Sequence, residues 1–175
     1  AKQTTERLFY TTEFDSLFIQ GLCHLHADSL TLAQESFKKC QKLESKSAVV
    51  AYQLANISAM KRDTTTATKL LKKAVRYNKS NYFYYSTLAE WYTAINDYKA
   101  ATQIYQTICK KFPDKEYPLY MLSRCYLQLG DYAKSIKTYE QLETRIGVTA
   151  EMSLEKAYVM ALQGNWDGMK REFER

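Results

Sequence analysis

The stretch LSRCYLQLGDY, from Leu122 to Tyr132, is the clearest indication of the fold of this chain. Its small residue Ser123 suits a point where two helix backbones approach closely. Asp131 has a side chain that can accept hydrogen bonds from the free N–H groups that open a helix, and bulky Tyr132 follows directly. The stretch therefore predicts the end of one helix, a short turn and the start of a second helix.

The same arrangement recurs when the sequence is compared with itself at a shift of 34 residues. Five segments come into register without a gap, starting at Phe14, Ala48, Tyr82, Glu116 and Ala150. Position eight is small in every segment: Gly21, Ala55, Ala89, Ser123 and Ala157. Position twenty is small in four of the five: Ala33, Ala67, Ala101, Ser135 and Met169. These two columns predict the crossing points of paired helices.

Three further columns complete each repeat. Position sixteen carries a helix-capping side chain: Ser29, Asp63, Asp97, Asp131 and Asn165. Position seventeen is predicted to wedge between the paired helices: Leu30, Thr64, Tyr98, Tyr132 and Trp166. The same role is predicted for position twenty-four: Phe37, Leu71, Tyr105, Tyr139 and Phe173. Pro113 closes the third repeat, and Pro118 falls in the first turn of a helix, where proline is tolerated.

The columns predict an all-α chain of antiparallel helix hairpins. The expected helices span residues 14–27, 30–44, 48–61, 64–77, 82–95, 98–112, 116–129, 132–145, 150–163 and 166 onward. Residues 1–13 are expected to be a lead-in, either the end of a preceding helix or a linker, and 14–175 an array of about five repeats. The last repeat is expected to be cut short, because Phe173 lies two residues before the end of the sequence.

These residues resemble the tetratricopeptide repeat, most strongly in the third and fourth repeats. The resemblance implies a right-handed superhelical solenoid whose concave groove receives peptides, in the style of bacterial arrays, many of which are exported. The best-known groove of the family is a basic and amide clamp for the C-terminal carboxylate of chaperone tails. Only Asn56 matches that clamp, since Phe18 and Leu22 stand where its first lysine and asparagine are expected.

Nothing in the sequence indicates catalysis, a cofactor or a metal site. His24 and His26 are two residues apart on a predicted helix and point in different directions. The sequence contains no glycine-rich phosphate loop and no nucleophile elbow. Four cysteines form no C-x-x-C pair and are expected to be reduced and at least partly buried: Cys23, Cys40, Cys109 and Cys125.

A second stripe on the first helix of each repeat is the predicted binding surface. It combines positions two, five, nine and twelve, which lie away from the core columns at ~100° per residue. Thirteen of its twenty residues are apolar or aromatic. The residues predicted to contact a partner are Phe18, Leu22, Tyr52, Asn56, Phe83, Glu90, Tyr117, Tyr120, Arg124 and Tyr158. The other interpretation is that part of the stripe packs against the chain itself.

The net charge of +6 supports a rival hypothesis. Six basic residues recur at the 34-residue spacing in the first two repeats: Lys38, Lys39, Lys42, Lys72, Lys73 and Arg76. This basic ridge fits an RNA-binding helical-repeat protein. It does not continue into the later repeats, where it would be expected in a protein that binds along a nucleic-acid strand, because affinity rises with the number of phosphates contacted. A third alternative is the non-catalytic array of a larger enzyme.

The leading hypothesis is a scaffold that binds a protein or peptide in an aromatic groove. Nucleic acid is not the expected partner, and self-association through the open ends of the array is a further expectation. The sequence has no run of about 18 apolar residues that could cross a membrane. The compartment stays open between the cytoplasm and a bacterial cell envelope.

Overall fold

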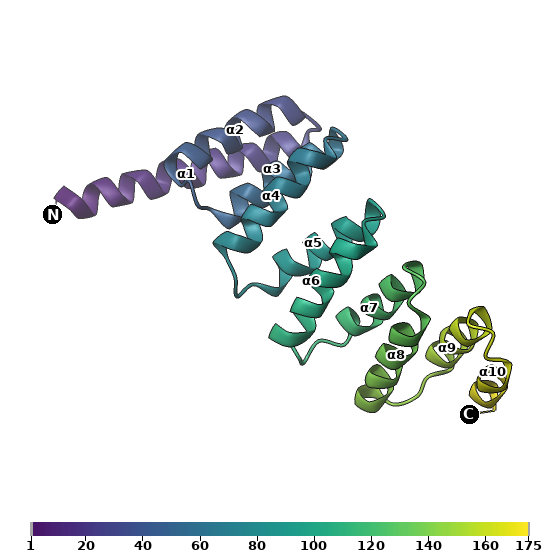
Figure 1. The fold of residues 1–175 in the computed structure, drawn as a ribbon. Helices are drawn as coiled ribbons and strands as arrows, with labels where there is room; N and C mark the ends of the chain where they lie inside the picture. The colour runs from purple at the N-terminus through teal and green to yellow at the C-terminus, as the bar shows by residue number, and fades with distance from the viewer. Residues whose placement is uncertain (1, 175) are drawn as a thin grey trace. The chain divides into compact units, whose positions relative to one another are not determined.

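The computed structural model describes residues 2–174, and side chains from residue 12 to residue 174. Within this range the chain forms ten α-helices that fold back on one another in pairs (Figure 1). Residue 1 of the predicted lead-in and residue 175 of the predicted fifth repeat lie outside the described residues, as do the side chains of 2–11. The predicted all-α fold of helical hairpins is confirmed.

The chain divides into two compact units, residues 1–84 and residues 85–175. The first unit contains α1 (Lys2–His26), α2 (Leu30–Leu43), α3 (Ala48–Met60), α4 (Thr64–Tyr77) and the start of α5 (Tyr82–Ala94). The second contains the rest of α5, then α6 (Tyr98–Lys111), α7 (Tyr117–Gln128), α8 (Tyr132–Ile146), α9 (Ala150–Leu162) and α10 (Trp166–Phe173). Helices that follow one another in sequence pack together within each unit.

The helix boundaries agree with the sequence prediction to within two residues, except at α1. That helix starts at Lys2 and runs through residues 2–13, so the predicted first helix is the second half of a longer one. At the other end of the chain, α10 has 8 residues, whereas α6 has 14.

The turn inside each hairpin repeats the same backbone conformation. The residue before the capping position has a positive φ between 56° and 79° in all five repeats: Asp28, Arg62, Asn96, Gly130 and Gly164. The next residue then caps the second helix, as Asp97 does by accepting a hydrogen bond from the backbone N–H of Ala100 at 3.0 Å. Four of the five predicted caps make this bond, and Ser29 does not.

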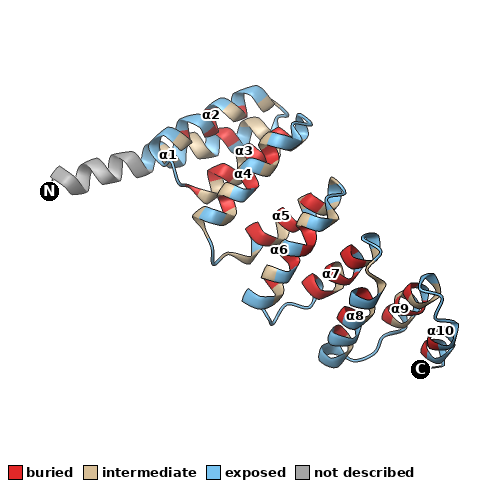
Figure 2. Cartoon of the chain, in the orientation of Figure 1, coloured by how far each residue is buried: buried red, intermediate tan, exposed pale blue. Residues whose placement is uncertain are grey.

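Small residues lie at the predicted helix crossings. Ala55, Ala89 and Ala157 are buried, and a Cβ on Gly21 would approach the ring of Phe37 to 2.7 Å. At the fourth crossing, the hydroxyl of Ser135 donates a hydrogen bond of 2.9 Å to the carbonyl of Ser123. Because the side chains at these columns are small, the inner face of each hairpin closes into a buried layer (Figure 2).

Three predicted wedges do not fill the core. Trp166 and Phe173 in the fifth repeat are 59% and 60% exposed, and Thr64 in the second repeat is exposed. Whether a side chain in these columns is buried depends on the helices that neighbour it, so the same column can be buried in one repeat and exposed in another. The wedge prediction holds for the buried residues Phe37, Leu71, Tyr105 and Tyr139.

The cysteine prediction is partly wrong. All four thiols are free, Cys40 and Cys125 are buried, and Cys109 is half-buried. Cys23, however, is exposed. Its counterparts at position ten of other repeats, Ile57 and Val159, are fully buried.

An ion triad that the sequence analysis missed joins the last three helices. The ammonium of Lys156 on α9 lies 2.7 Å from a carboxylate oxygen of Glu143 on α8 and 3.0 Å from one of Glu172 on α10. The Lys156 side chain is only 2% exposed, and both carboxylates are nearly buried. Charged groups enter a protein interior only when paired, so this triad fixes α8, α9 and α10 to one another.

Candidate partner-binding face

The predicted stripe divides between the two units. Five residues lie in the first unit: Phe18, Leu22, Tyr52, Asn56 and Phe83. The other five lie in the second: Glu90, Tyr117, Tyr120, Arg124 and Tyr158. The two groups are described separately below.

Phe18 lies against the core of the first hairpin. Its ring meets Phe37 edge to face at 5.4 Å between centroids and stacks on Phe14 at 6.0 Å. The side chain is half-buried and packs against the hydrophobic cluster formed by α2 and α3. Leu22, one turn further along α1, is exposed. Phe18 therefore packs partly against the chain itself, and Leu22 is the more exposed residue of this pair.

Tyr52 and Phe83 form an aromatic cluster within the first unit. Their ring centroids are 5.1 Å apart in an edge-to-face arrangement, and Tyr84 lies 5.6 Å from Phe83. Tyr84 is buried, whereas Phe83 is 47% exposed. Asn56, one turn after Tyr52 on α3, is half-buried. The structure thus brings two predicted site residues from neighbouring hairpins into direct contact.

The second unit presents the more open part of the stripe. Tyr117 at the start of α7 is 51% exposed, and Tyr158 on α9 is 58% exposed. Arg124 and Glu90 are also exposed. Partial burial raises the pKa of the Glu90 carboxyl, and burial together with the nearby Glu90 charge raises the pKa of Tyr117.

Tyr120 contacts side chains on two neighbouring helices as well as one on its own helix. Its hydroxyl donates a hydrogen bond of 2.8 Å to Glu155 on α9, and its ring lies edge to face with Tyr139 at 6.3 Å. The guanidinium of Arg124 lies 5.8 Å from the centroid of the same ring. Burial, followed by the hydrogen bond to Glu155, raises the pKa of Tyr120. Replacing Tyr120 would therefore disturb folding as well as any binding.

Glu155 joins two tyrosines from different helices. One carboxylate oxygen accepts the hydrogen bond from Tyr120 on α7, and the other accepts one from the buried hydroxyl of Tyr139 on α8. Burial and this hydrogen bond raise the pKa of Tyr139. The sequence analysis did not include Glu155, because position six lies between the core columns and the stripe. Its only sequence signal is an acidic residue in a column where the other repeats have Ile19, Gln53, Thr87 and Met121.

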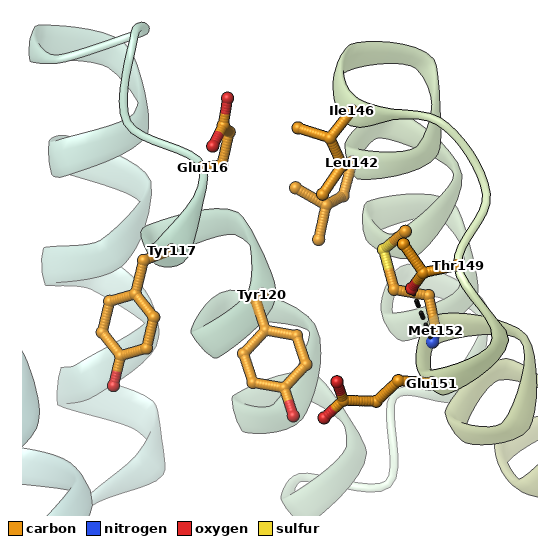
Figure 3. Close-up of a pocket in the computed structure, with 8 residues that line it drawn as sticks. All are labelled: Glu116, Tyr117, Tyr120, Leu142, Ile146, Thr149, Glu151 and Met152. Atoms are coloured by element: carbon orange, nitrogen blue, oxygen red, sulfur yellow. Dashed lines mark hydrogen bonds between the residues drawn. The ribbon is translucent and has the colours of Figure 1, made fainter.

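A pocket of about 330 Å³ opens beside the two tyrosines of α7. The described residues that line it are Glu116, Tyr117, Tyr120, Leu142, Ile146, Thr149, Glu151 and Met152. Figure 3 shows Leu142 and Ile146 pointing from α8 towards the start of α7, with Glu151 close to the hydroxyl end of Tyr120. Thr149 caps α9 by accepting a hydrogen bond from the backbone N–H of Met152 at 3.3 Å. Three of these residues lie on the predicted stripe, Tyr117, Tyr120 and Glu151, and the first two were predicted to contact a partner.

The basic ridge of the first unit is exposed, apart from half-buried Lys73. Beside it, Lys46, Arg76 and Tyr77 line a shallow hollow of about 460 Å³. The guanidinium of Arg76 lies 5.5 Å from the ring centroid of Tyr77. The ridge residues are thus on the surface, as the anion-binding hypothesis requires.

Among the residues that the structure describes, no three His, Cys, Asp or Glu side chains are grouped so that they could hold a metal ion. None of the described helices is long and apolar enough to cross a membrane.

A model of the tetratricopeptide repeat matches residues 92–145 of the sequence. No curated protein matches the chain. The fold resembles a crystal structure of MamA, which is 17% identical, over 93% of this chain and 88% of that one, with a TM-score of 0.75. A tetratricopeptide repeat protein from Parabacteroides merdae is 19% identical, over 93% and 65% of the two chains, with a TM-score of 0.77.

YrrB, described as a tetratricopeptide repeat protein with an unusual peptide-binding site, is 14% identical over 94% of this chain and 89% of its own, with a TM-score of 0.72. The structural similarities extend over nearly the whole chain, whereas the sequence match runs from the end of α5 to the last turn of α8. Residues 92–145 therefore match the tetratricopeptide repeat, and the chain as a whole has the fold of solved tetratricopeptide-repeat proteins.

Proposed function

We propose that this protein is a non-catalytic scaffold that binds a partner protein or peptide on the stripe of its second unit. The observation that carries the proposal is the exposure of two large aromatic side chains, Tyr117 and Tyr158, together with the pocket that Tyr117 lines. Exposed aromatic residues around a preformed pocket are typical anchor sites, because burying each ring removes a large apolar area from water. YrrB, which has the same fold, is described as binding peptides.

The exposed aromatic residues are distributed in a way that suits an extended or helical ligand. Tyr117 is on α7 and Tyr158 is on α9, and Leu154, one turn before Tyr158, is also exposed. Arg124 adds a guanidinium that can make charge-assisted hydrogen bonds to a carbonyl or carboxylate. Rigid helices hold these groups, so little ordering is required when a partner binds.

The experiment is a parallel affinity purification from the source organism with three forms of the full chain as bait. The forms are the wild type, the double variant Tyr117→Ala with Tyr158→Ala, and the ridge variant Lys72→Glu with Lys73→Glu. A partner held on the stripe is retained by the wild type and by the ridge variant and lost from the tyrosine variant. Titration of that partner should then show about 1–3 kcal/mol lost for each tyrosine.

The ridge variant tests the rival function in the same experiment. If RNA or another polyanion is recovered with the wild type and only the ridge variant loses it, the stripe is not the binding surface. Binding through the ridge would also weaken steeply as salt is added, since phosphate contacts release counterions. That result would replace the proposed function with anion binding by the first unit.

A further inference from the structure

The pocket beside Tyr117 and Tyr120 has a chemical character that selects its ligand. Leu142, Ile146 and Met152 supply apolar surface, and the two tyrosine rings stand on one side (Figure 3). Thr149 and two carboxylates, Glu116 and Glu151, complete the lining. The eight lining residues include no lysine and no arginine. A volume of about 330 Å³ lies at the small end of the range for ligand pockets, which is about 300–1,000 Å³.

Both carboxylates stand at the start of a helix, where the helix dipole favours a negative charge. Glu116 stands at the N-cap of α7 but makes no capping hydrogen bond through its side chain. Glu151 lies in the first turn of α9, close enough to Tyr120 to affect the pKa of that hydroxyl. Both side chains are exposed, and neither forms an ion pair within the described part of the chain.

The basic residues that adjoin lining residues in the sequence, and Arg124 on α7, make contacts of their own. Arg145 donates a hydrogen bond of 2.7 Å to the carbonyl of Pro113, and Lys115 pairs with Asp114 at 3.5 Å. Arg124 lies over the ring of Tyr120 without lining the pocket. The negative charge of the pocket therefore remains available to a ligand.

From this arrangement we infer that the pocket receives a lysine or arginine side chain of the bound partner. The aliphatic stem packs on Leu142, Ile146 and Met152, while the cationic head lies near the carboxylates and the tyrosine rings. Cations are attracted to the faces of aromatic rings by the ring quadrupole and to the carboxylates by charge. The protein would thus select a basic residue next to apolar anchors, and this inference rests on the proposed function.

The test begins with a phage library of random dodecapeptides, selected on the full chain. Peptides that bind the wild type should share a lysine or arginine. Each is then synthesised with that residue and with an uncharged replacement, norleucine for lysine or citrulline for arginine. The uncharged form should bind the wild type about 3- to 30-fold more weakly, which corresponds to one partly desolvated cationic contact.

The matched variants are Glu116→Gln with Glu151→Gln, which keeps the size of the pocket residues, and Glu35→Gln with Glu140→Gln as a control. The control alters the net charge equally at two exposed sites that do not line the pocket. The pocket variant should lose the preference for the basic residue and the control should keep it. Loss in both variants would reflect general charge attraction and would overturn the inference.

Two other results separate the inference from the function beneath it. If selected peptides require Tyr117 and Tyr158 but bind equally well with the uncharged residue, the stripe binds peptides and the assignment of the pocket is wrong. If no selected peptide depends on either tyrosine, both the inference and the proposed function fail.

Discussion

Replacing Lys156 with methionine is expected to destabilise the last hairpin by about 3–5 kcal/mol. At an effective dielectric constant of about 20, each of the two attractions in the triad amounts to about 5–6 kcal/mol. These values follow from the distances of 2.7 Å to Glu143 and 3.0 Å to Glu172. Desolvation of three buried charged groups offsets most of this sum, so the intact triad adds little net stability. Removing only the ammonium takes away the attraction of Lys156, which offsets much of the desolvation cost of the two nearly buried carboxylates.

The assay is hydrogen exchange of individual helices, because arrays of repeats do not unfold as one cooperative unit. The Lys156→Met variant should lose protection in α9 and α10, while α3 and α4 stay unchanged. The control is the variant Glu143→Gln, Lys156→Met, Glu172→Gln, which removes all three charges at similar volume. It should recover most of the lost protection. The reasoning is refuted if Lys156→Met has no effect, or if the uncharged triple variant is as unstable as the single one.

Two further predictions concern the core. Ala89 lies at a fully buried helix crossing, where the atoms added by Ala89→Leu have no space. The substitution should lower the free energy of unfolding in urea by about 1–3 kcal/mol. Unchanged stability would show that the two helices can move apart at this crossing. Burial raises the pKa of the Cys40 and Cys125 thiols, so less thiolate forms near pH 8 and iodoacetamide should modify exposed Cys23 first. The reaction of Cys40 and Cys125 with iodoacetamide should increase on unfolding, or as the pH rises through their raised pKa values. Equal reaction of Cys23, Cys40 and Cys125 at pH 8 in the folded protein would contradict this prediction.

The hairpin repeat could be predicted from the amino-acid sequence alone. Local chemistry fixes its main features, since small residues such as Ala89 allow helices to cross closely and Asp97 satisfies the free N–H groups at a helix start. Both signals depend on residues within one repeat. They therefore placed every helix start except that of α1, whose residues 2–13 lie outside the repeating pattern.

The candidate face was predicted less completely, because its surface depends on contacts between repeats. A helical wheel put Phe18 and Tyr120 on the same stripe as Tyr117. The structure shows that Phe18 packs on Phe37 and that Tyr120 donates a hydrogen bond to Glu155, while Tyr117 remains exposed. Tertiary structure decided these differences, because the neighbouring helix determines whether a side chain on a given face meets protein or water.

The periodic pattern of the sequence could not predict the pocket or the ion triad. The pocket combines the starts of α7 and α9 with the end of α8, three segments that no single helical wheel contains. The triad likewise needs one residue from each of α8, α9 and α10. Periodicity identifies which side of a helix is apolar, but only the packing of successive helices brings Lys156 to Glu143 and Glu172, or gathers Glu116 and Glu151 around the same apolar space.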